Sequence, residues 1–363
     1  MKYRGALLTL AASVTAFLFA IFASALVLLL TTSESPLTVF QAMWEFGTTR
    51  DSLASTLNRA TPMYVAGIAA AIGFKMNLLN IGVEGQYRIA VLLAASVGAA
   101  VSLPKILHIG LILIVAMIAG MLWALIPAIL KVTRNVHEVI STIMMNAIAI
   151  GLGAWLFTTY LKDEKASTIN PRTPRLDESA FLGAIWRPEG ADAVTGFLVF
   201  AVLLGIGYYV LVWKTRFGFD LRASGLNPIA ARTAGVDAKR MVFTAMLMSG
   251  AVAGLVAMPA LLSDFHAYSN DQIPSGLGFA GIGVALLGRN HPFGVAIGAL
   301  VFAFIDRSAL ILDLEGIPKE IVRIMQAIIV LSVVIAYEVA RRIGERRTAS
   351  ALAARTPATG STA

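Results

Sequence analysis

The sequence contains no cysteine and only four histidines, which removes whole classes of chemistry. Without thiols the chain can form no disulfide bond, no thiolate nucleophile and no cysteine-ligated metal site. The histidines stand at positions 108, 137, 266 and 291, without the spacing that is typical of a metal centre. We therefore expect neither a metal site nor cysteine-based catalysis in this chain.

Charged residues are scarce as well. They make up 14% of the chain, against about a quarter in soluble domains, while 58% of the residues are hydrophobic. The apolar runs approach about 20 residues, the length that crosses a hydrocarbon core of ~30 Å. A β-barrel is excluded because its strands would alternate in units of ~10 residues. The sequence predicts an all-α fold, a polytopic transmembrane bundle of helices.

Motifs for nucleotide binding and for catalysis are missing too. The sequence has no GxxxxGK[ST] loop, no nucleophile elbow, no HExxH helix and no pair of carboxylates within an apolar run. We expect no enzyme activity and no cofactor in this chain, so that any ATP and Mg²⁺ would be bound by a partner subunit. The net charge of +8 includes no basic run interleaved with aromatics, which argues against a nucleic-acid partner.

The apolar runs predict about ten membrane spans, some of them short. The predicted spans cover residues 5–30, 61–75, 89–103, 106–130, 137–160, 196–213, 241–262, 276–288, 293–311 and 321–340. Residues 36–46, ahead of the second span, have the mixed pattern of an interfacial helix.

The distribution of positive charge orients this topology. With both termini in the cytoplasm, 18 of the 29 Lys and Arg residues fall on the cytoplasmic side, and five of the others lie in one long exterior loop, 161–195. Long loops count little in the positive-inside rule, so this orientation is consistent. We predict a transmembrane permease domain over residues 1–347 and a disordered cytoplasmic tail over residues 348–363.

Polar, glycine-containing stretches separate the second predicted span from the third, and the eighth from the ninth. Residues 76–88, between the second and third spans, form either a cytoplasmic turn or a broken helix inside the membrane. Non-helical backbone survives at membrane depth only where protein or a water-filled cavity satisfies it. A similar break follows the eighth span near residue 289. Broken helices in matching, oppositely oriented halves are typical of a central transport site.

The longest polar interruption with a positive bias is residues 214–240, which we call the elbow. Its sequence, KTRFGFDLRASGLNPIAARTAGVDAKR, predicts two short helices with a break between them. Asn227 followed by Pro228 is typical of an N-cap and a first helical position. Gly235 is placed to close that helix in the left-handed conformation.

The upstream part of the elbow predicts a second, shorter helix, a single turn between Asp220 and Gly225. Small residues keep one side of the elbow thin, so that the backbone of another protein can approach closely. An ordinary cytoplasmic loop with the expected positive charge is the alternative interpretation.

The fifth predicted span carries polar side chains along one side. Asn135 and Glu138 are spaced like an N-cap and its third-position acid. Beyond them Ser141, Thr142 and Asn146 follow at i+3, i+4 and i+8 from Glu138, so they lie on neighbouring faces. Asn146 lies ~12 Å along the helix from Glu138, deep enough to meet a polar solute, although an interhelical hydrogen bond is an equal alternative.

Four stretches resemble one family of transport proteins, in the family's own order. R-A-S-G-L-N-P-I-A-A-R-T-A-G resembles the coupling loop of ABC-importer permeases, and L-N-I-G-V-E-G-Q resembles the hallmark of their nucleoside and simple-sugar branch. N-V-H-E-V-I-S-T-I-M-M-N-A-I-A is similar to the family's fifth span, except that Val136 and His137 separate Asn135 from Glu138. G-F-A-G-I-G-V-A-L-L-G-R-N-H-P-F-G is similar to its eighth and ninth spans.

The resemblance implies a permease subunit of an ATP-driven importer for nucleosides or related simple sugars, multi-pass in the bacterial cytoplasmic (inner) membrane. The chain is similar to the branched-chain-amino-acid/ribose type of binding-protein-dependent permeases. The implied partners are an ABC ATPase with two nucleotide-binding domains in one chain, a second related permease, an extracytoplasmic substrate-binding lipoprotein and membrane lipid.

The resemblance and the polar pattern together give two sets of candidate residues. The substrate path is predicted to contain Asn77, Asn80, Glu84, Gln86, Ser141, Thr142, Asn146 and Phe279. The contact with the ATPase is predicted to contain Arg222, Ala223, Gly225, Asn227, Ala230, Ala231, Arg232 and Gly235.

An ion-coupled secondary transporter or a channel for a small polar solute is the competing hypothesis. Proteins of that class keep ionisable groups inside their spans for coupling. The only acids near span interiors here are Glu84, Glu138 and Asp306, and each can be explained by a span end or a break. The sequence therefore favours the ATP-driven importer.

Overall fold

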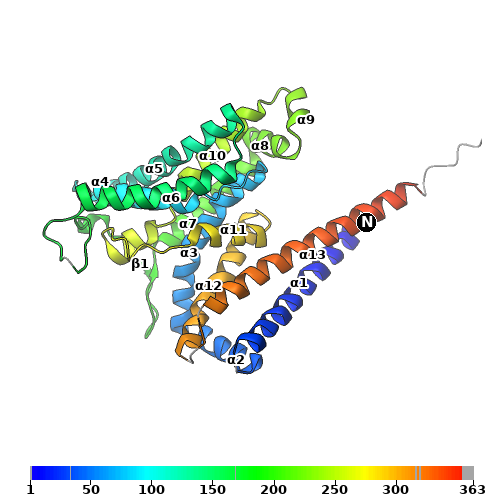
Figure 1. Cartoon of the computed structure of the whole chain (residues 1–363), viewed down its shortest axis with the longest axis horizontal. Helices are drawn as coiled ribbons and strands as arrows, with labels where there is room; N and C mark the ends of the chain where they lie inside the picture. The colour runs from blue at the N-terminus through cyan, green and yellow to red at the C-terminus, as the bar shows by residue number, and fades with distance from the viewer. Residues whose placement is uncertain (1, 33, 168, 315–316, 319, 354–363) are drawn as a thin grey trace, which may run out of the picture. The chain divides into compact units, whose positions relative to one another are not determined.

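The computed structural model describes residues 2–32, 34–167, 169–314, 317–318 and 320–353, and these are mostly helical (Figure 1). The chain divides into two compact units, one made from residues 1–44 and 309–363, the other from residues 45–308. In the first unit, α1 (Lys2–Thr31) and α13 (Glu320–Ala353) lie side by side and run in opposite directions (Figure 1). The prediction of an all-α fold is confirmed.

The second unit holds most of the remaining helices. They are α3 (Arg50–Lys75), α4 (Val83–Ala99), α5 (Lys105–Arg134), α6 (Glu138–Leu156), α7 (Phe197–Lys214), α8 (Arg216–Leu226), α9 (Pro228–Thr233), α10 (Ala238–Gly254) and α11 (Leu277–Leu287). Short π-helical segments, Phe157–Leu161 and Ala260–Phe265, extend α6 and follow α10. Helices α2 (Pro36–Gly47) and α12 (Pro292–Leu314) run from one unit into the other.

The long loop between α6 and α7 carries the strands of this unit. A 3₁₀ turn, Glu178–Ala180, is followed by β1 (Ala184–Trp186), which pairs antiparallel with β2 (Val194–Thr195). Asn58 of α3 fixes the second strand, since its side chain donates to the Ala193 carbonyl and accepts from the Thr195 amide.

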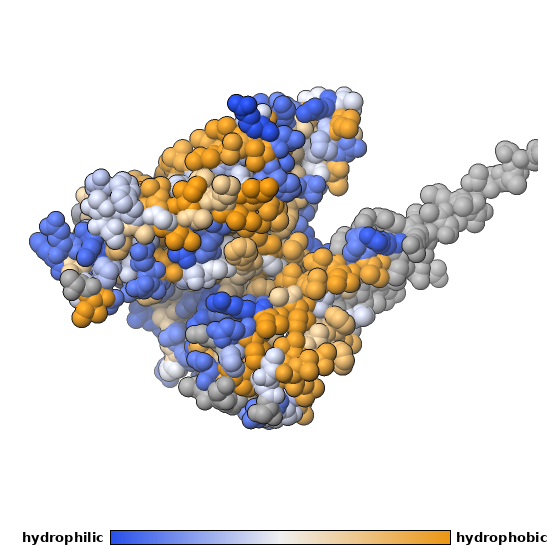
Figure 2. Space-filling model, in the orientation of Figure 1, coloured by the Kyte–Doolittle hydropathy of each residue, from blue (hydrophilic) through white to orange (hydrophobic). Residues whose placement is uncertain are grey.

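Within the described residues, four helices are long and apolar enough to cross a membrane: α5, α6 with its π-helical extension, α7 and α12. A fifth candidate joins Leu18–Thr31 to α2 through a bend of 114°. The exposed faces of α5 and α6 are strongly apolar (Figure 2), with Ile114, Ile118, Leu122 and Ile126 in one stripe along α5. A multi-span helical protein is therefore confirmed, while ten spans and cytoplasmic termini stay predictions.

Helix α3 is longer than the apolar run that marks it. It begins at Arg50, capped by the Thr49 hydroxyl, and so includes a polar first third that hydropathy leaves out. Those turns are held by ion pairs, because Arg59 pairs with Asp306 of α12 at 2.6 Å and Asp51 pairs with Arg307. At the other end of the chain, α13 continues to Ala353, into the segment predicted as a disordered tail; residues 354–363 lie outside the described residues.

Glycines bring α5 and α10 unusually close together. A Cβ on Gly250 would lie 2.7 Å from the carbonyl oxygen of Gly120, and one on Gly254 would overlap the carbonyl oxygen of Ala116. The GxxxG spacing of Gly250 and Gly254 therefore serves a crossing within this chain, where van der Waals contact between backbones replaces the absent hydrophobic effect.

We predict that Gly254→Ala destabilises the protein by about 1–3 kcal/mol, because the added methyl group must push α5 and α10 apart. The measurement is thermal unfolding of the purified chain in detergent. Gly151→Ala on α6 is the matched control, since its Cβ would meet nothing within 4 Å. Equal melting temperatures for the two variants would contradict the close crossing.

Candidate functional site

The non-helical break between α3 and α4 is shorter than predicted, covering residues 76–82, because α4 already begins at Val83. Helix α3 closes with the pattern of a Schellman motif. The Leu78 amide donates to the Gly73 carbonyl, and the Asn77 amide donates to the Phe74 carbonyl. Asn77 has a φ of 59°, the left-handed position that asparagine tolerates better than most residues. The left-handed backbone of Asn77 thus serves to end α3.

A buried amide cluster fixes the second half of this break. The Asn80 side chain donates to Gln86 Oε1 at 3.0 Å and to Ser249 Oγ of α10 at 2.8 Å, and it accepts from the Gly82 amide. Ser249 in turn donates to the Ala69 carbonyl of α3. Asn80 and Gln86 are 4% and 1% exposed. The cluster therefore joins α3, α4 and α10 around the broken backbone.

Asn146 joins the same break to α6. Its Oδ1 accepts from the Gly85 amide at 2.8 Å, and its Nδ2 donates to the Ile81 carbonyl at 2.9 Å. A Cβ on Gly85 would lie only 2.9 Å from Asn146 Oδ1, which explains the glycine at that position. Asn146 thus supplies a donor and an acceptor to backbone groups that have lost their helical partners.

Glu84 joins the start of α4 to the start of α11. Its carboxylate accepts from the amides of Gly276 and Gly278 at 3.0–3.1 Å and pairs with Arg88 Nε at 3.1 Å. A carboxylate at a helix N-terminus satisfies free amide donors and interacts favourably with the helix dipole. A Cβ on Gly278 would lie 2.7 Å from the Glu84 amide nitrogen, so α11 approaches α4 closely there.

The polar residues at the start of α6 bond mainly within their own helix. The hydroxyls of Ser141 and Thr142 donate to the Glu138 carbonyl, at 3.1 and 2.7 Å. The Glu138 carboxylate pairs with Lys131 Nζ of α5 at 2.8 Å.

The predicted N-cap of this helix is wrong. His137 caps α6, accepting from the Val139 amide through Nδ1, whereas Asn135 closes the preceding α5 with a φ of 53°. Asparagine suits both an N-cap and a left-handed helix end, and the three-residue linker between these helices, residues 135–137, leaves it only the second role.

The predicted path residues thus fall into two groups. Six are buried with their polar groups bonded inside the protein: Asn80, Glu84, Gln86, Ser141, Thr142 and Asn146. Two are exposed, Asn77 on the break and Phe279 on α11, the latter by 60%. Ser249 belongs to the cluster but was not predicted, because a single serine in an apolar run carries no signal of its partner on another helix.

The elbow forms two helices, as predicted, but with different bounds upstream. Thr215 caps α8, which runs unbroken to Leu226, so the single turn between Asp220 and Gly225 is wrong. Gly225 stays within the helix, at the point where α8 packs closely against the end of α3. Downstream the prediction is confirmed: Asn227 Oδ1 accepts from the amides of Ile229 and Ala230, Pro228 starts α9, and Gly235 has a φ of 85°.

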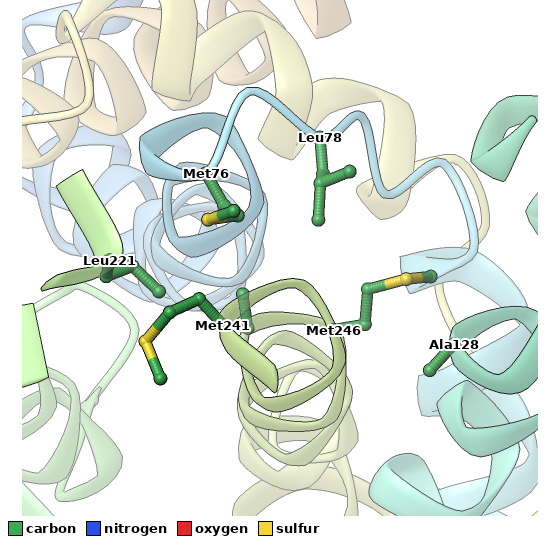
Figure 3. Packing of buried hydrophobic residues seen from close by; sticks show 7 residues of the cluster. Met76, Leu78, Ala128, Leu221, Met241 and Met246 are labelled. Carbon is green, nitrogen blue, oxygen red and sulfur yellow. The ribbon is translucent and has the colours of Figure 1, made fainter. Parts of the chain in front are cut away.

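The elbow packs directly on the break. A Cβ on Gly225 would meet the Lys75 carbonyl oxygen and would lie 2.9 Å from Met76 Cα. Beside it Leu221 of α8 packs with Met76, Leu78 and Met241 in an apolar cluster (Figure 3). The other buried members of the cluster are Ala128, Ala245 and Met246. Helix α8 therefore packs directly against both the end of α3 and α10.

The predicted ATPase-contact residues are divided between the exposed side of the elbow and its packed side. Asn227, Ala230, Arg232 and Gly235 are exposed, Arg222, Ala223 and Gly225 are partly buried, and Ala231 is buried at 4%. The tip also exposes two large apolar side chains, Leu226 by 88% and Ile229 by 78%. These two were not singled out from the sequence, because apolar residues are the rule in this chain.

The chain matches one family model over residues 52–334, which includes the break, the elbow and α11. The family is described as the permease component of branched-chain amino acid transport systems. This chain belongs to that family. The permease is 36% identical to the guanosine ABC transporter permease NupP of Bacillus subtilis, over 79% of this chain and 82% of the relative.

Two further relatives extend the comparison. The permease is 32% identical to the glucose ABC transporter permease TsgB13 of Haloferax volcanii, over 78% of this chain and 76% of the relative. It is 28% identical to a second guanosine ABC transporter permease of Bacillus subtilis, NupQ, over 74% and 84%. A solved ABC transporter assigned to the metal-chelate type, in an inward-facing conformation, matches 90% of this chain and 96% of its own. The two sequences are 14% identical, and the TM-score is 0.42.

We predict that Asn146→Ala destabilises this permease by about 2–5 kcal/mol, because it leaves the Gly85 amide and the Ile81 carbonyl buried without partners. Thermal unfolding in detergent measures the loss. Ser141→Ala, which removes a hydroxyl bonded within α6, is the control and should change stability by no more than about 1 kcal/mol. A loss no larger in Asn146→Ala than in the control would show that the bridge is not needed.

Proposed function

We propose that this chain is the permease subunit of an ATP-driven ABC importer for nucleosides or related simple sugars. The observation that carries the proposal is the similarity to a guanosine ABC transporter permease across four fifths of both chains, at 36% identity. Because a glucose permease is also similar, at 32%, sugars stay within the substrate class. Nucleosides and sugars share hydroxyl groups, which neutral amides and hydroxyls recognise by donating and accepting hydrogen bonds.

The solute path, in this proposal, runs along an exposed surface of the permease that a second subunit covers. The buried amides are already bonded to backbone and to one another, so they cannot turn to a solute without breaking the fold around the break. Among the predicted path residues, Asn77 and Phe279 keep exposed faces. Phe279 offers a ring on which a base or a sugar face can stack.

The second subunit is proposed to be a related but different permease. Bacillus subtilis has two permeases named for guanosine that both match this chain, NupP at 36% and NupQ at 28% identity. This chain would correspond to the first kind and its partner to the second. Two further partners complete the proposed importer in the cytoplasmic membrane. One is an ATPase with two nucleotide-binding domains in one chain, which binds ATP and Mg²⁺, and the other is an extracytoplasmic binding lipoprotein.

The elbow, residues 214–240, is proposed as the contact with the ATPase. Support comes from its exposed tip, where Leu226 at the end of α8 and Ile229 in α9 project among small neighbours, and from its packing on the end of α3. Desolvated apolar anchors flanked by small or charged residues are typical of binding hot spots. Closure of the ATPase would then move α8 against Lys75 and Met76, and so reach the break.

Ion coupling, the competing mechanism, finds no support in the acids near the spans. Glu84 pairs with Arg88, Glu138 with Lys131 and Asp306 with Arg59. Each carboxylate is therefore neutralised within the fold, whereas a coupling site needs an acid that can exchange its ion during transport.

Uptake in a deletion strain tests the substrate class. Restoring this gene with its neighbouring transport genes should restore saturable uptake of labelled guanosine, and a hundredfold excess of another nucleoside should abolish it. Competition by glucose but by no nucleoside would assign the importer to sugars. Uptake by the purified chain alone, driven by a proton or sodium gradient, would sink the proposal.

Replacing Ile229 with Asp should reduce co-purification of the ATPase at least about tenfold, because a charge then faces the desolvated centre of the contact. Uptake should fall with it, while membrane insertion is unchanged. Ile169→Asp in the α6–α7 loop is the control, since that side chain is 89% exposed but far from the elbow in the chain. If the ATPase binds both variants equally, the elbow is not its contact.

A further inference from the structure

An apolar groove of about 470 Å³ lies between α3, α7 and α12, all within the unit made from residues 45–308. Its walls include Tyr64 of α3, Gly205 and Tyr209 of α7, and Phe293 and Ala296 of α12. A Cβ on Gly205 would overlap the Tyr64 hydroxyl, so the glycine allows the tyrosine ring to lie against α7. The groove is apolar along its length, and the one threonine in its wall, Thr61, donates its hydroxyl to the Leu57 carbonyl of its own helix.

One end of the groove is marked by an aromatic cluster. Tyr209 and His291 line the groove and also contact Trp213, with ring centroids 5.5 and 5.2 Å away. These residues stand at the end of α7 and the start of α12, beside the end of α3. Tryptophan and tyrosine gather at the level of lipid headgroups, which indicates that this end of the groove lies at a membrane surface.

Two lysines stand at the same end. Lys75 Nζ lies 4.9 Å above the Trp213 ring and Lys214 Nζ lies 5.8 Å from the Tyr209 ring. Among the residues that the structure describes, neither lysine has a carboxylate partner in an ion pair. Two positive charges that form no ion pair within the described part of the chain, at the mouth of an apolar groove, are complementary to a molecule with an anionic head and an apolar tail.

The length of the groove fits one leaflet. Along α7 the lining runs from Leu198 to Tyr209, about 17 Å at 1.5 Å per residue. Half of a ~30 Å hydrocarbon core is about 15 Å. The lysines end α3 and α7 on the side predicted to be cytoplasmic, and the cytoplasmic leaflet is the one rich in anionic lipid.

We propose that this groove binds one acyl chain of an anionic phospholipid whose phosphate is held by Lys75 and Lys214. The site is distinct from the proposed solute path, and it adjoins the elbow, to which Lys214 belongs. Because α7 leads directly into α8, the bound lipid would fix the helix that carries the elbow.

Native mass spectrometry of the full chain tests the site. The protein is delipidated in mild detergent and mixed with equal amounts of phosphatidylglycerol and phosphatidylcholine of identical acyl chains. We expect one phosphatidylglycerol to be retained preferentially. Replacing both lysines, Lys75→Gln with Lys214→Gln, should weaken its binding about 25-fold, near fivefold for each charge. Lys239→Gln, which removes one charge elsewhere on the predicted cytoplasmic side, should leave it unchanged.

Filling the groove gives the second test. Ala296→Phe places a ring where the acyl chain would lie and should abolish the preference, whereas Ala147→Phe on the exposed face of α6 should not. A phosphatidylglycerol with a photoreactive acyl chain should label peptides of α7 and α12 in the unaltered protein, whatever the folding of the variants. Equal retention of the two lipids, or labelling confined to other helices, would overturn the proposal.

Discussion

The structure depends on one constraint: a helix broken between α3 and α4 leaves backbone amides and carbonyls without partners, in a chain whose surroundings are apolar. Unsatisfied backbone groups cost several kcal/mol each in such a medium, so the break exists only because side chains replace the lost bonds. Asn80 and Asn146 do this for the break, while the Glu84 carboxylate accepts from the free Gly276 and Gly278 amides at the start of α11. In doing so they join α4 to α10, α6 and α11, and the polar residues that stand out in the sequence become the centre of the helical packing.

The same break is where the elbow makes contact. Gly225 brings α8 against the last carbonyl of α3, and Leu221 sits in the apolar cluster beneath it (Figure 3). Packed interfaces of this kind shift between discrete arrangements and do not deform continuously. A movement of α8 would therefore act on the end of α3. The proposed lipid would bind at the end of α7, which leads into α8 and also lies beside the end of α3. Solute path, ATPase contact and lipid site would then share the end of α3.

Local signals were reliable where a single stretch of chain decides the outcome. The N-cap at Asn227, the proline at the first helical position and the left-handed Gly235 are all confirmed, because capping involves only neighbouring residues. Where two local roles competed, the prediction was wrong: Asn135 closes α5 although it is also a good N-cap, and Gly225 stays within α8 although glycine often ends a helix. The polar first third of α3 was not predicted as helix, because the ion pairs that hold it connect it to residues of α12 that are distant in the sequence.

Composition alone determined that this is a multi-span helical membrane protein, since the length of its apolar runs is a property of the chain itself. The motifs alone also located the break and the elbow. Only the tertiary structure decided what the amides do, because a hydrogen-bond partner such as Ser249, 169 residues from Asn80, has no trace in local pattern. It likewise decided that α8 rests on α3 and that an apolar groove ends in lysines and aromatics, since both require helices that fold together from separate parts of the sequence.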